Sequence, residues 1–370
     1  MLRIAHLIDA QGGGALTYVL TLARVTARED ASVEVIFFIP GPVERLAREL
    51  GIKTVVISKK MPLDPTLIWR ISGYLKKKKI DIMHTHTLNG NFYGRLAATL
   101  AGIPVVTTMH GYMDELSAQN LNTRTRLFCR IDRLMWGMSS RFIAVTPGIG
   151  ERLRQQGLAP DRVEVITNAI DLPRPGLQAG PDIRRELGIR PSSTVVSIVG
   201  RLVPVKNHDL FIRAAKAALE KFPDTQFLII GDGPLSGKLK VLSDELGMGE
   251  SVIFAGWRND MEQIYRATDI LVLCSHSEGL PFAILEAMSH GKAVIATDIK
   301  EIGGVVINGS TGLLVPPGNV DALAGAIVRL IEDPLLRKRL GSGARAFVEK
   351  NFSVKTMVTR VVGLYRGLAV

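Results

Sequence analysis

The sequence has little cysteine and no long hydrophobic run. Its 370 residues include only Cys129 and Cys274, which lie far apart in apolar surroundings. This argues against a disulfide framework and against a cysteine metal site, so a reducing cytoplasm is the expected compartment. Hydrophobic residues make up 46% of the chain, yet no apolar run approaches the roughly 20 residues that cross a bilayer. We therefore expect a soluble protein.

The sequence is also short of negative charge and of aromatic residues. Lys and Arg number 46 against 35 Asp and Glu, a net charge of +11. Residues 1–175 carry 23 cations against 15 acids (+8), and the rest carry 23 against 20 (+3). A basic first half suits phosphate, anionic lipid or nucleic acid, although simple solubility charge explains it equally well. Aromatic residues are only 6% and no basic-aromatic stacking motif is evident, which argues against nucleic acid.

The length and the pattern of apolar runs predict two α/β domains. A chain of 370 residues is too long for one ordinary core and fits two domains of roughly 150 to 190 residues. Short β-type runs alternate with helical stretches, which predicts a parallel, doubly wound sheet in each half. The predicted strands are Leu2–Ile8, Val33–Ile39, Thr54–Ile57, Ile80–Thr85, Pro104–Met109, Arg141–Val145 and Val163–Ile166, then Thr194–Val199, Gln226–Ile230, Val252–Ala255, Ile270–Leu273, Ala293–Ala296 and Gly312–Val315.

A segment rich in Pro and Gly separates the two halves. Asn168–Pro181 has neither a helical nor an alternating pattern and is expected to be the linker. We therefore expect an N-terminal domain over residues 1–170, a C-terminal domain over residues 182–352 and a final helical stretch over residues 353–370.

Polar motifs follow the predicted strands of the first half. The first strand runs into Gly12, Gly13 and Gly14 before a helix, an arrangement that suits an anion at a helix N-terminus or simply a tight turn. His84, His86 and His110 cluster near strand ends, with His86 and His110 expected at one edge of the sheet. No helical pair of histidines or nearby cysteines supports zinc, so hydrogen bonding is the preferred interpretation and no metal is predicted. His110 is a candidate for substrate contact, or a histidine satisfied in the core.

The second half places two cations after its first strand. Gly200 is followed by Arg201, and Lys206 comes five residues later. Open α/β sheets bind ligands at the carboxyl ends of their strands. A guanidinium clamps phosphate oxygens in a bidentate way and a lysine acts as a point charge, so the pair suits a pyrophosphate. Surface solubility charge is the alternative.

The segment Ser275–Ala287 carries the sharpest signal. It follows a buried strand and opens a helix expected from about Pro281 to Ser289. Gly279 permits close backbone approach, and the amides near Leu280, Phe282 and Ala283 are expected to point outward as donors at a helix start. Glu278 and Glu286, with seven residues between them, are natural acceptors for sugar and ribose hydroxyls. The alternative is that both acids merely stabilise the helix dipole.

One further absence bears on this site. The chain has no D-x-D triplet, the commonest carboxylate arrangement for holding a divalent ion on a nucleotide diphosphate. Phosphate charge would then be met by Arg, Lys and helix N-termini. The segment from Gly231 to Pro234 is interpreted only as a turn.

Five motifs of the second half, GRLVPVKN, IIGDGP, FAGW, EGLPFAILEAMSHGKAVIATD and STGLLVPPGN, occur in the order and spacing of one family. The chain resembles glycosyltransferase family 4, the group 1 transferases, over nearly its whole length. The first half is similar more loosely, through GGG, HTH, MHG, AVTPGI and ITNAID. The resemblance implies a GT-B fold, in which two Rossmann-like domains place their parallel sheets across a central cleft.

The resemblance also implies a reaction, which is transfer of a sugar from a nucleoside-diphosphate sugar to a hydroxyl acceptor with retention of anomeric configuration. No cofactor or metal is expected. Cell-surface polysaccharide or glycolipid synthesis, with a lipid-linked acceptor, is the expected context.

Site roles are carried over only where the motifs match. Arg201 and Lys206 would neutralise the pyrophosphate, Glu278 would lie near the sugar ring and Glu286 would hold the ribose. His110 would lie near the transferred sugar, and Gly13 and Gly14 would face the phosphate and acceptor. Gly200, Gly279, Leu280 and Phe282 complete the expected donor site, and His86 is assigned to the acceptor side. The final helix would cross back to the first domain.

Two residues depart from the family pattern. Cys274 stands where the family often has Pro, and Pro281 stands where many members have Gly. The second departure removes one backbone donor to the sugar.

Two alternatives to a transferase stay open at this point. A sugar-nucleotide epimerase on the same scaffold would also need a pyrophosphate site. A basic membrane-binding or nucleic-acid-binding protein is the non-enzymatic alternative.

A peripheral contact with anionic membrane is compatible with catalysis. Residues 59–79 are basic, and in Arg124–Arg133 and just beyond it Leu127, Phe128, Leu134 and Trp136 interleave the arginines. A buried helix with a charged outer face explains the second pattern as well, and Lys76–Lys79 read more simply as a solvated helix end. The expected location is the cytoplasm, and peripheral association with the inner face of the cell membrane is compatible with it.

Overall fold

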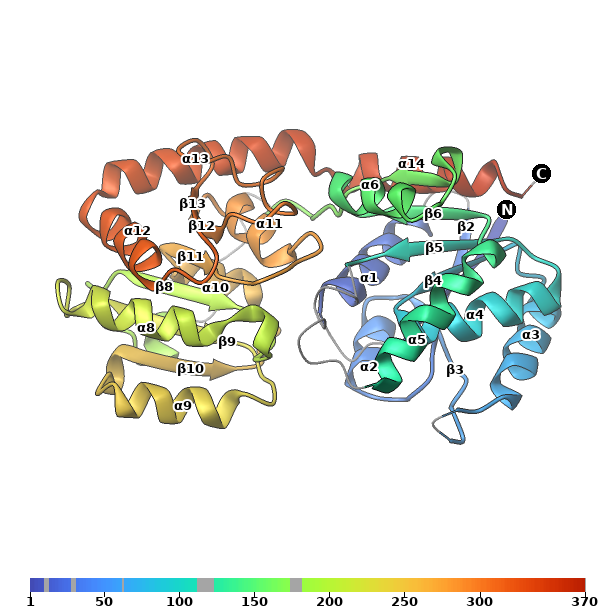
Figure 1. Ribbon diagram of the computed structural model, residues 1–370, viewed down its shortest axis with the longest axis horizontal. Helices are drawn as coiled ribbons and strands as arrows, with labels where there is room; N and C mark the ends of the chain where they lie inside the picture. Colours follow the sequence, from blue (N-terminus) through green and yellow to red (C-terminus); the bar gives the residue numbers. More distant parts are fainter. Residues whose placement is uncertain (10–12, 28–30, 62, 112–122, 174–181, 370) are drawn as a thin grey trace. The chain divides into compact units, whose positions relative to one another are not determined.

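The structure is a computed structural model that describes residues 1–9, 13–27, 31–61, 63–111, 123–173 and 182–369, with the side chains of residues 123–126 left out. The chain divides into two compact units. Unit 1 comprises Met1–Ala169 and Val354–Val370, and unit 2 comprises Ile170–Ser353. Each unit is a parallel sheet with helices packed against it (Figure 1).

The sheet of unit 1 has the strand order β3-β2-β1-β4-β5-β6-β7, with parallel pairing throughout the described strands. The order reverses between β1 and β4, which is the position where doubly wound sheets bind ligands. Its strands are β1 (Leu2–Ile8), β2 (Ala31–Phe37), β3 (Lys53–Val56), β4 (Ile82–His86), β5 (Val105–Met109), β6 (Arg141–Ala144) and β7 (Val163–Val165). Each overlaps one of the predicted strands of the first half.

Helices of unit 1 bury apolar faces against this sheet. Leu67 and Ile71 of α3 and Ala97 of α4 pack in one core with Leu7 and Met83 of the strands. The helices are α1 (Gly14–Thr26), α2 (Pro42–Glu49), α3 (Thr66–Lys78), α4 (Leu88–Ala101), α5 (Thr123–Leu134), α6 (Pro147–Gln155) and α14 (Val354–Arg366), with short 3-10 turns η1 (Met135–Met138) and η2 (Pro160–Arg162). The C-terminal helix α14 thus belongs to unit 1, where it packs beside α1.

The sheet of unit 2 has the strand order β10-β9-β8-β11-β12-β13 and is also parallel. Its order reverses between β8 and β11, so a ligand site is expected at their carboxyl ends. The strands are β8 (Val195–Val199), β9 (Gln226–Ile230), β10 (Val252–Gly256), β11 (Ile270–Leu273), β12 (Ala293–Thr297) and β13 (Leu313–Val315).

A continuous apolar core joins the helices of unit 2 to its sheet. Phe211 of α8 and Ile327 of α12 pack with Ile198, Phe227 and Val272 of the strands. The helices are α7 (Ile183–Glu186), α8 (His208–Leu219), α9 (Ser236–Glu245), α10 (Met261–Ala267), α11 (Phe282–Ser289), α12 (Val320–Glu332) and α13 (Pro334–Asn351), with 3-10 turns η3 (Pro204–Lys206) and η4 (Gly249–Ser251).

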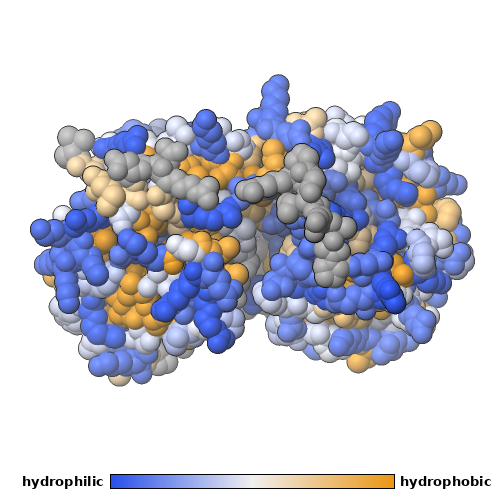
Figure 2. Space-filling view, turned by 180° about the vertical axis from the view of Figure 1, so that it is seen from behind, coloured by the Kyte–Doolittle hydropathy of each residue, from blue (hydrophilic) through white to orange (hydrophobic). Residues whose placement is uncertain are grey.

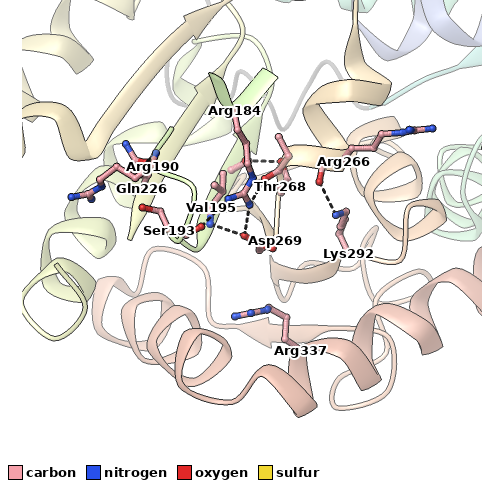
Figure 3. A network of polar contacts seen from close by, with 12 residues as sticks. Arg184, Arg190, Ser193, Val195, Gln226, Arg266, Thr268, Asp269, Lys292 and Arg337 are labelled. Atoms are coloured by element: carbon pink, nitrogen blue, oxygen red, sulfur yellow. Dashed lines mark hydrogen bonds and ion pairs between the residues drawn. The ribbon is translucent and has the colours of Figure 1, made fainter. Parts of the chain in front are cut away.

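A polar network fixes the amino ends of β8 and β11 (Figure 3). Asp269 precedes β11, and its Oδ2 accepts hydrogen bonds from the Val195 amide and from Arg184, both at 2.9 Å. Arg184 also donates to the carbonyl oxygens of Ala267 at 2.9 Å and Ser193 at 3.0 Å. The short helix α7 is thereby tied to one end of the sheet, and the opposite end carries the polar motifs described below.

On the face drawn in Figure 2 the surface is mainly hydrophilic, with apolar patches between the polar side chains. Among the residues described, no helix combines the length and the apolar character needed to cross a bilayer.

Candidate functional site

Glycines after β9 fix the loop that follows β8. The Gly200 amide donates to the Ile230 carbonyl oxygen at 2.9 Å, and the Leu202 amide donates to the Asp232 carbonyl oxygen at 3.0 Å. A Cβ on Gly231 would lie 2.0 Å from the carbonyl oxygen of Gly200, and one on Gly233 would lie 2.6 Å from that of Leu202. The segment from Gly231 to Pro234 is therefore more than a turn, because its missing side chains let the Gly200 loop pack against it.

Arg201 lies at the exposed end of this loop. Within the described part of the chain its guanidinium forms no hydrogen bond or ion pair. Lys206, at the end of η3, turns back so that its stem lies against Gly200, where a Cβ would be 3.7 Å from Lys206 Cδ. Two cations thus flank the carboxyl end of β8.

Glu278 joins Lys206 in a partly buried ion pair. The Lys206 ammonium lies 2.5 Å from Glu278 Oε1, and the Ser275 hydroxyl donates to the same oxygen at 2.6 Å. The Glu278 side chain is 8% exposed and that of Lys206 is 22% exposed. Ser275 is the second residue after β11 and was not predicted as a site residue. The one sequence signal for it is its position next to the end of a strand. We refer to Lys206, Ser275 and Glu278 as the Lys206 cluster.

Backbone bonds hold together the two loops that carry this cluster. The His276 amide donates to the Val205 carbonyl oxygen at 2.9 Å, and Cys274 Sγ lies 3.1 Å from that of Asn207. Thr297 of β12 donates to the Ser275 carbonyl oxygen at 2.7 Å. Burial raises the pKa of the Cys274 thiol to about 12, so this residue is a neutral donor and not a nucleophile.

The helix α11 begins one residue later than predicted. Pro281 is its N-cap, with ψ 119 and therefore extended, and Phe282 is the first helical residue. No side chain caps this end, which leaves the first-turn amides and the positive end of the helix dipole for an anion or hydroxyl. Leu280 and Phe282 are 5% and 7% exposed, so we expect their backbone, not their side chains, to meet a ligand. Gly279 is half-buried beside them.

Glu286 lies on α11 and is held by a residue that the sequence did not reveal. The Tyr265 hydroxyl, from α10, donates to Glu286 Oε2 at 2.7 Å. Burial raises the pKa of Glu286, and the hydrogen bond from Tyr265 counters that rise. One carboxylate oxygen is therefore fixed by the protein.

Unit 2 thus brings some of the predicted residues into direct contact and leaves others nearby. Lys206 lies beside Gly200 and pairs with Glu278, and Arg201 follows Gly200 directly. Glu286 is paired separately with Tyr265. All of them follow β8 or β11, the two strands between which the strand order reverses.

In unit 1, the glycines form the start of α1. Gly13 is the N-cap, with φ 86 and ψ 178, a conformation that favours glycine, and Gly14 is the first helical residue. Both are exposed, and no side chain caps the helix. Gly12 lies outside the described residues.

Histidines line the same end of the unit 1 sheet. His86 is the last residue of β4 instead of following it, and His110 follows β5. Nδ1 of His86 lies 3.1 Å from Nε2 of His110, and Nε2 of His86 lies 3.0 Å from Nδ1 of His6. The structure therefore joins His86 and His110, and it adds His6 of β1, which no motif in the sequence marks.

Among the described residues, one group of His, Cys, Asp or Glu side chains has a spacing that could hold a metal ion, and it lies in this region. His6, His84 and His86 are buried, and each offers a ring nitrogen within 4.8 Å of the others. Both nitrogens of His84 are already hydrogen-bonded, Nδ1 to the Tyr365 hydroxyl at 2.5 Å and Nε2 to that of Thr108 at 2.6 Å.

Two family models cover almost the whole chain. The model described as "Glycosyl transferases group 1" matches residues 180–347, and the model described as "Glycosyltransferase Family 4" matches residues 12–174.

Named relatives are transferases as well. The chain is 33% identical over 303 residues to the Escherichia coli UDP-Gal:alpha-D-GlcNAc-diphosphoundecaprenol alpha-1,3-galactosyltransferase, covering 80% of this chain and 78% of that protein. It is 29% identical to the D-inositol 3-phosphate glycosyltransferase of Rhodococcus jostii, covering 96% of this chain and 84% of that protein.

The fold resembles solved glycosyltransferase structures. Anabaena HepE, solved with UDP and glucose, matches with a TM-score of 0.88 at 24% identity over 100% of both chains. The sucrose-phosphate synthase of Thermosynechococcus elongatus matches with a TM-score of 0.82 at 21% identity, over 100% of this chain and 99% of that one. Two Rossmann-like units and these neighbours confirm the predicted GT-B fold.

Because family models match both halves and the E. coli relative is 33% identical over four fifths of this chain, the protein belongs to the group 1 glycosyltransferases of family 4.

Proposed function

We propose that the protein transfers a hexose from a UDP-sugar to a hydroxyl group of its acceptor, with unit 2 binding the donor. The observation that carries this proposal is the pair of cations at the carboxyl end of β8, an exposed Arg201 and a Lys206 held beside Gly200. The choice of UDP is supported by the E. coli relative, which is named for UDP-Gal, and by HepE, which was solved with UDP-glucose.

The diphosphate would displace Glu278 as the main partner of Lys206. As the bond between the sugar and the phosphate breaks, negative charge grows on the leaving diphosphate, and fixed positive groups stabilise it most in the transition state. Arg201 suits a bidentate contact, Lys206 a point charge, and the uncapped start of α11 adds its dipole.

The remaining predicted residues would orient the donor. Glu286 has one oxygen held by Tyr265, so the other is the natural acceptor for ribose hydroxyls. Backbone amides of Gly279, Leu280 and Phe282 would meet the sugar and phosphate. In unit 1, Gly13 and Gly14 would offer the start of α1, and His110 would meet the transferred sugar.

Retention of configuration and independence of metal belong to the same proposal. The acceptor oxygen would attack on the face from which the diphosphate departs, and a phosphate oxygen would take the hydroxyl proton. A sugar adduct on Glu278, detected by intact mass after incubation with donor, would contradict same-face attack, and loss of activity in EDTA would contradict metal independence.

Substitution of the two cations tests the proposal. We expect Arg201→Ala and Lys206→Ala to fold normally and to lower turnover at least about a hundredfold. Arg339→Ala and Lys338→Ala are matched controls, since both residues are exposed on α13. Near-normal turnover of both site variants would refute the assignment.

The acceptor is proposed to be a lipid-linked saccharide, as the name of the E. coli relative suggests. Formation of a labelled product that partitions into organic solvent, with a lipid-linked acceptor but not with water-soluble sugars, would support this. The epimerase alternative has no support among the relatives, and it predicts that donor alone is converted to a different sugar.

A membrane contact through α3 is proposed to bring the enzyme to such an acceptor. Met61, Leu63 and Trp69 are exposed by 56%, 51% and 62%, and Lys60 and Lys76–Lys79 are exposed close to them in the sequence. Trp69, Lys76 and Lys77 share a helix face, a pattern that suits an anionic bilayer surface. Leu127 and Leu134 of α5 are also exposed, whereas Trp136 is only 8% exposed. Only part of the second predicted segment is therefore available for a membrane contact.

Vesicle co-sedimentation tests this contact. Trp69→Ser with Lys76→Ser and Lys77→Ser should lower binding to vesicles containing phosphatidylglycerol at least about fivefold. Trp257→Ser, at a residue of unit 2 that is 68% exposed, is the control and should bind normally. Equal binding of all three proteins would contradict the contact. Cys129 and Cys274 are not joined in a disulfide, which fits the proposal of a cytoplasmic enzyme at the inner face of the membrane.

A further inference from the structure

One face of the unit 1 sheet is lined by imidazoles where apolar residues are usual. His6 of β1 pairs with His84 of β4, and His86 pairs with Ile8 and Thr108 of the flanking strands. His6, His84 and His86 are all 0% exposed. Parallel strands covered on both faces are normally almost continuously hydrophobic, so three buried imidazoles call for an explanation other than packing.

Three of the histidines form one line of hydrogen bonds. His6 Nδ1 lies 3.0 Å from His86 Nε2, and His86 Nδ1 lies 3.1 Å from His110 Nε2. The line runs from the buried strand β1 to the half-buried His110 after β5. We call His6, His86 and His110 the histidine relay.

Aromatic and polar neighbours enclose the relay without joining it. The His84 ring packs against those of His6 and His86, with centroids 4.9 and 4.2 Å apart. Its nitrogens bond instead to Tyr365 and Thr108. Tyr18 meets the His110 ring edge-on at 5.0 Å. The relay therefore has little freedom to reorient.

All three relay histidines are neutral at pH 7. Burial lowers the pKa of His6 and of His110 to about 3, and it holds the pKa of His86 well below its usual value. A neutral imidazole has one N–H and one bare nitrogen. In a line of neutral imidazoles the proton position on one ring therefore fixes the position on the next.

The buried end of the relay sets its direction. Nε2 of His6 is buried and has no hydrogen-bond partner among the described residues. A buried N–H without a partner is rarer than a buried acceptor without one, so the proton of His6 belongs on Nδ1, where it is donated to His86 Nε2. His86 must then carry its proton on Nδ1 and donate it to His110 Nε2. The proton of His110 is consequently on Nδ1.

We propose that His6 and His86 are positioning residues that fix His110 as the Nδ1–H tautomer, so that His110 presents a hydrogen-bond donor to a hydroxyl oxygen of the donor sugar. Placing the sugar at His110 rests on the proposed function, whereas the tautomer does not.

A buried metal ion is the competing explanation for the same residues. It would need the ring nitrogens of His6, His84 and His86, but both nitrogens of His84 are engaged by hydroxyl groups. A closed structural zinc site also needs a fourth ligand. Hydrogen bonds already occupy both nitrogens of His84 and of His86 and Nδ1 of His6. We therefore prefer the relay to a metal site.

The tautomer can be measured on the free enzyme. Protein labelled with ¹⁵N-histidine should show, in long-range proton–nitrogen spectra at pH 7, that His110 bears its proton on Nδ1, with His110→Asn providing the assignment. A proton on Nε2, a doubly protonated ring, or stoichiometric zinc in the purified protein would overturn the proposal.

A matched pair of substitutions at His6 tests the positioning role. His6→Asn keeps a donor near Nδ1 and should preserve the His110 tautomer and the KM for donor. His6→Leu removes the donor and should give mixed His110 tautomers and a KM about three- to tenfold higher. An unchanged tautomer in a folded His6→Leu protein would overturn the relay. If the tautomers behave as stated but no UDP-sugar is turned over, the proposed function fails and the relay stands.

Discussion

At the scale of single residues, the two acidic side chains of the proposed donor site are held by hydroxyl groups that donate hydrogen bonds to them. Ser275 bonds to Glu278, and Tyr265 bonds to Glu286. Each donor leaves the other carboxylate oxygen for a ligand and restricts the rotamers of the acid. Affinity gained in this way comes from preorganisation, since less side-chain entropy is lost when the ligand binds.

Tyr265→Phe tests this role. Loss of one hydrogen bond to Glu286 should raise the KM for UDP-sugar about three- to tenfold with little change in kcat, because the ribose contact is made in both ground and transition states. Steady-state kinetics at varied donor concentration is the measurement. Tyr74→Phe is a matched control, since Tyr74 donates to Glu34 in unit 1 and should leave KM unchanged. Equal KM values in all three proteins would remove Tyr265 from the site.

At the scale of elements, the conformation of the loop after β8, which carries Gly200 and Arg201, depends on backbone contacts that only glycine allows. Gly231 has φ +133, and its missing Cβ gives Gly200 room. The loops after β8 and β9 are therefore in direct backbone contact, and the position of Arg201 follows from that contact.

Gly231→Ala should disrupt this contact. The added methyl would need to displace backbone, so we expect the free energy of unfolding to fall by about 1–3 kcal/mol and donor affinity to weaken. Gly237→Ala is the control, because Gly237 is exposed on α9 with open space at its Cβ position, and it should be neutral or stabilising by up to about 1 kcal/mol. Urea unfolding compares the two, and similar losses would show that the close approach has no special cost.

Also at this scale, the elements were far more predictable than the contacts between them. Leu2–Ile8 was predicted with both bounds correct, because apolar runs between turn residues are a local signal. Glu278, Glu286, Arg201 and Lys206 could be predicted as site residues because strand ends and a helix start mark them locally, and their role in binding the donor stays a prediction. Their hydroxyl partners were not found, since Ser275 and Tyr265 are ordinary residues whose contacts depend on packing.

His6 illustrates the same limit, because its partner His86 is 80 residues away. The start of α11 was misplaced by one residue, since Pro is compatible with both the N-cap and the first turn.

At the scale of the whole molecule, buried neutral histidines link stability to pH. The pKa of His6 is about 3 in the folded protein and near 6.5 when unfolded. The unfolded chain therefore binds more protons between these values, and stability falls as the pH drops below about 6.5.

Lowering the pH from 7 to 5 should cost about 2 kcal/mol through His6 alone. Urea unfolding at both pH values measures the loss in the free energy of unfolding. In the His6→Asn protein this loss should be smaller by about 2 kcal/mol. The same pH dependence in both proteins would contradict a buried, neutral His6.

The central claim is that Arg201 and Lys206 bind the diphosphate of the donor. Titration calorimetry with UDP and with uridine isolates this contribution, since the two ligands differ by the diphosphate. Each alanine variant should bind UDP at least about tenfold more weakly while its affinity for uridine is unchanged. Wild-type affinity of both variants for UDP, or an equal loss for UDP and uridine, would contradict the account.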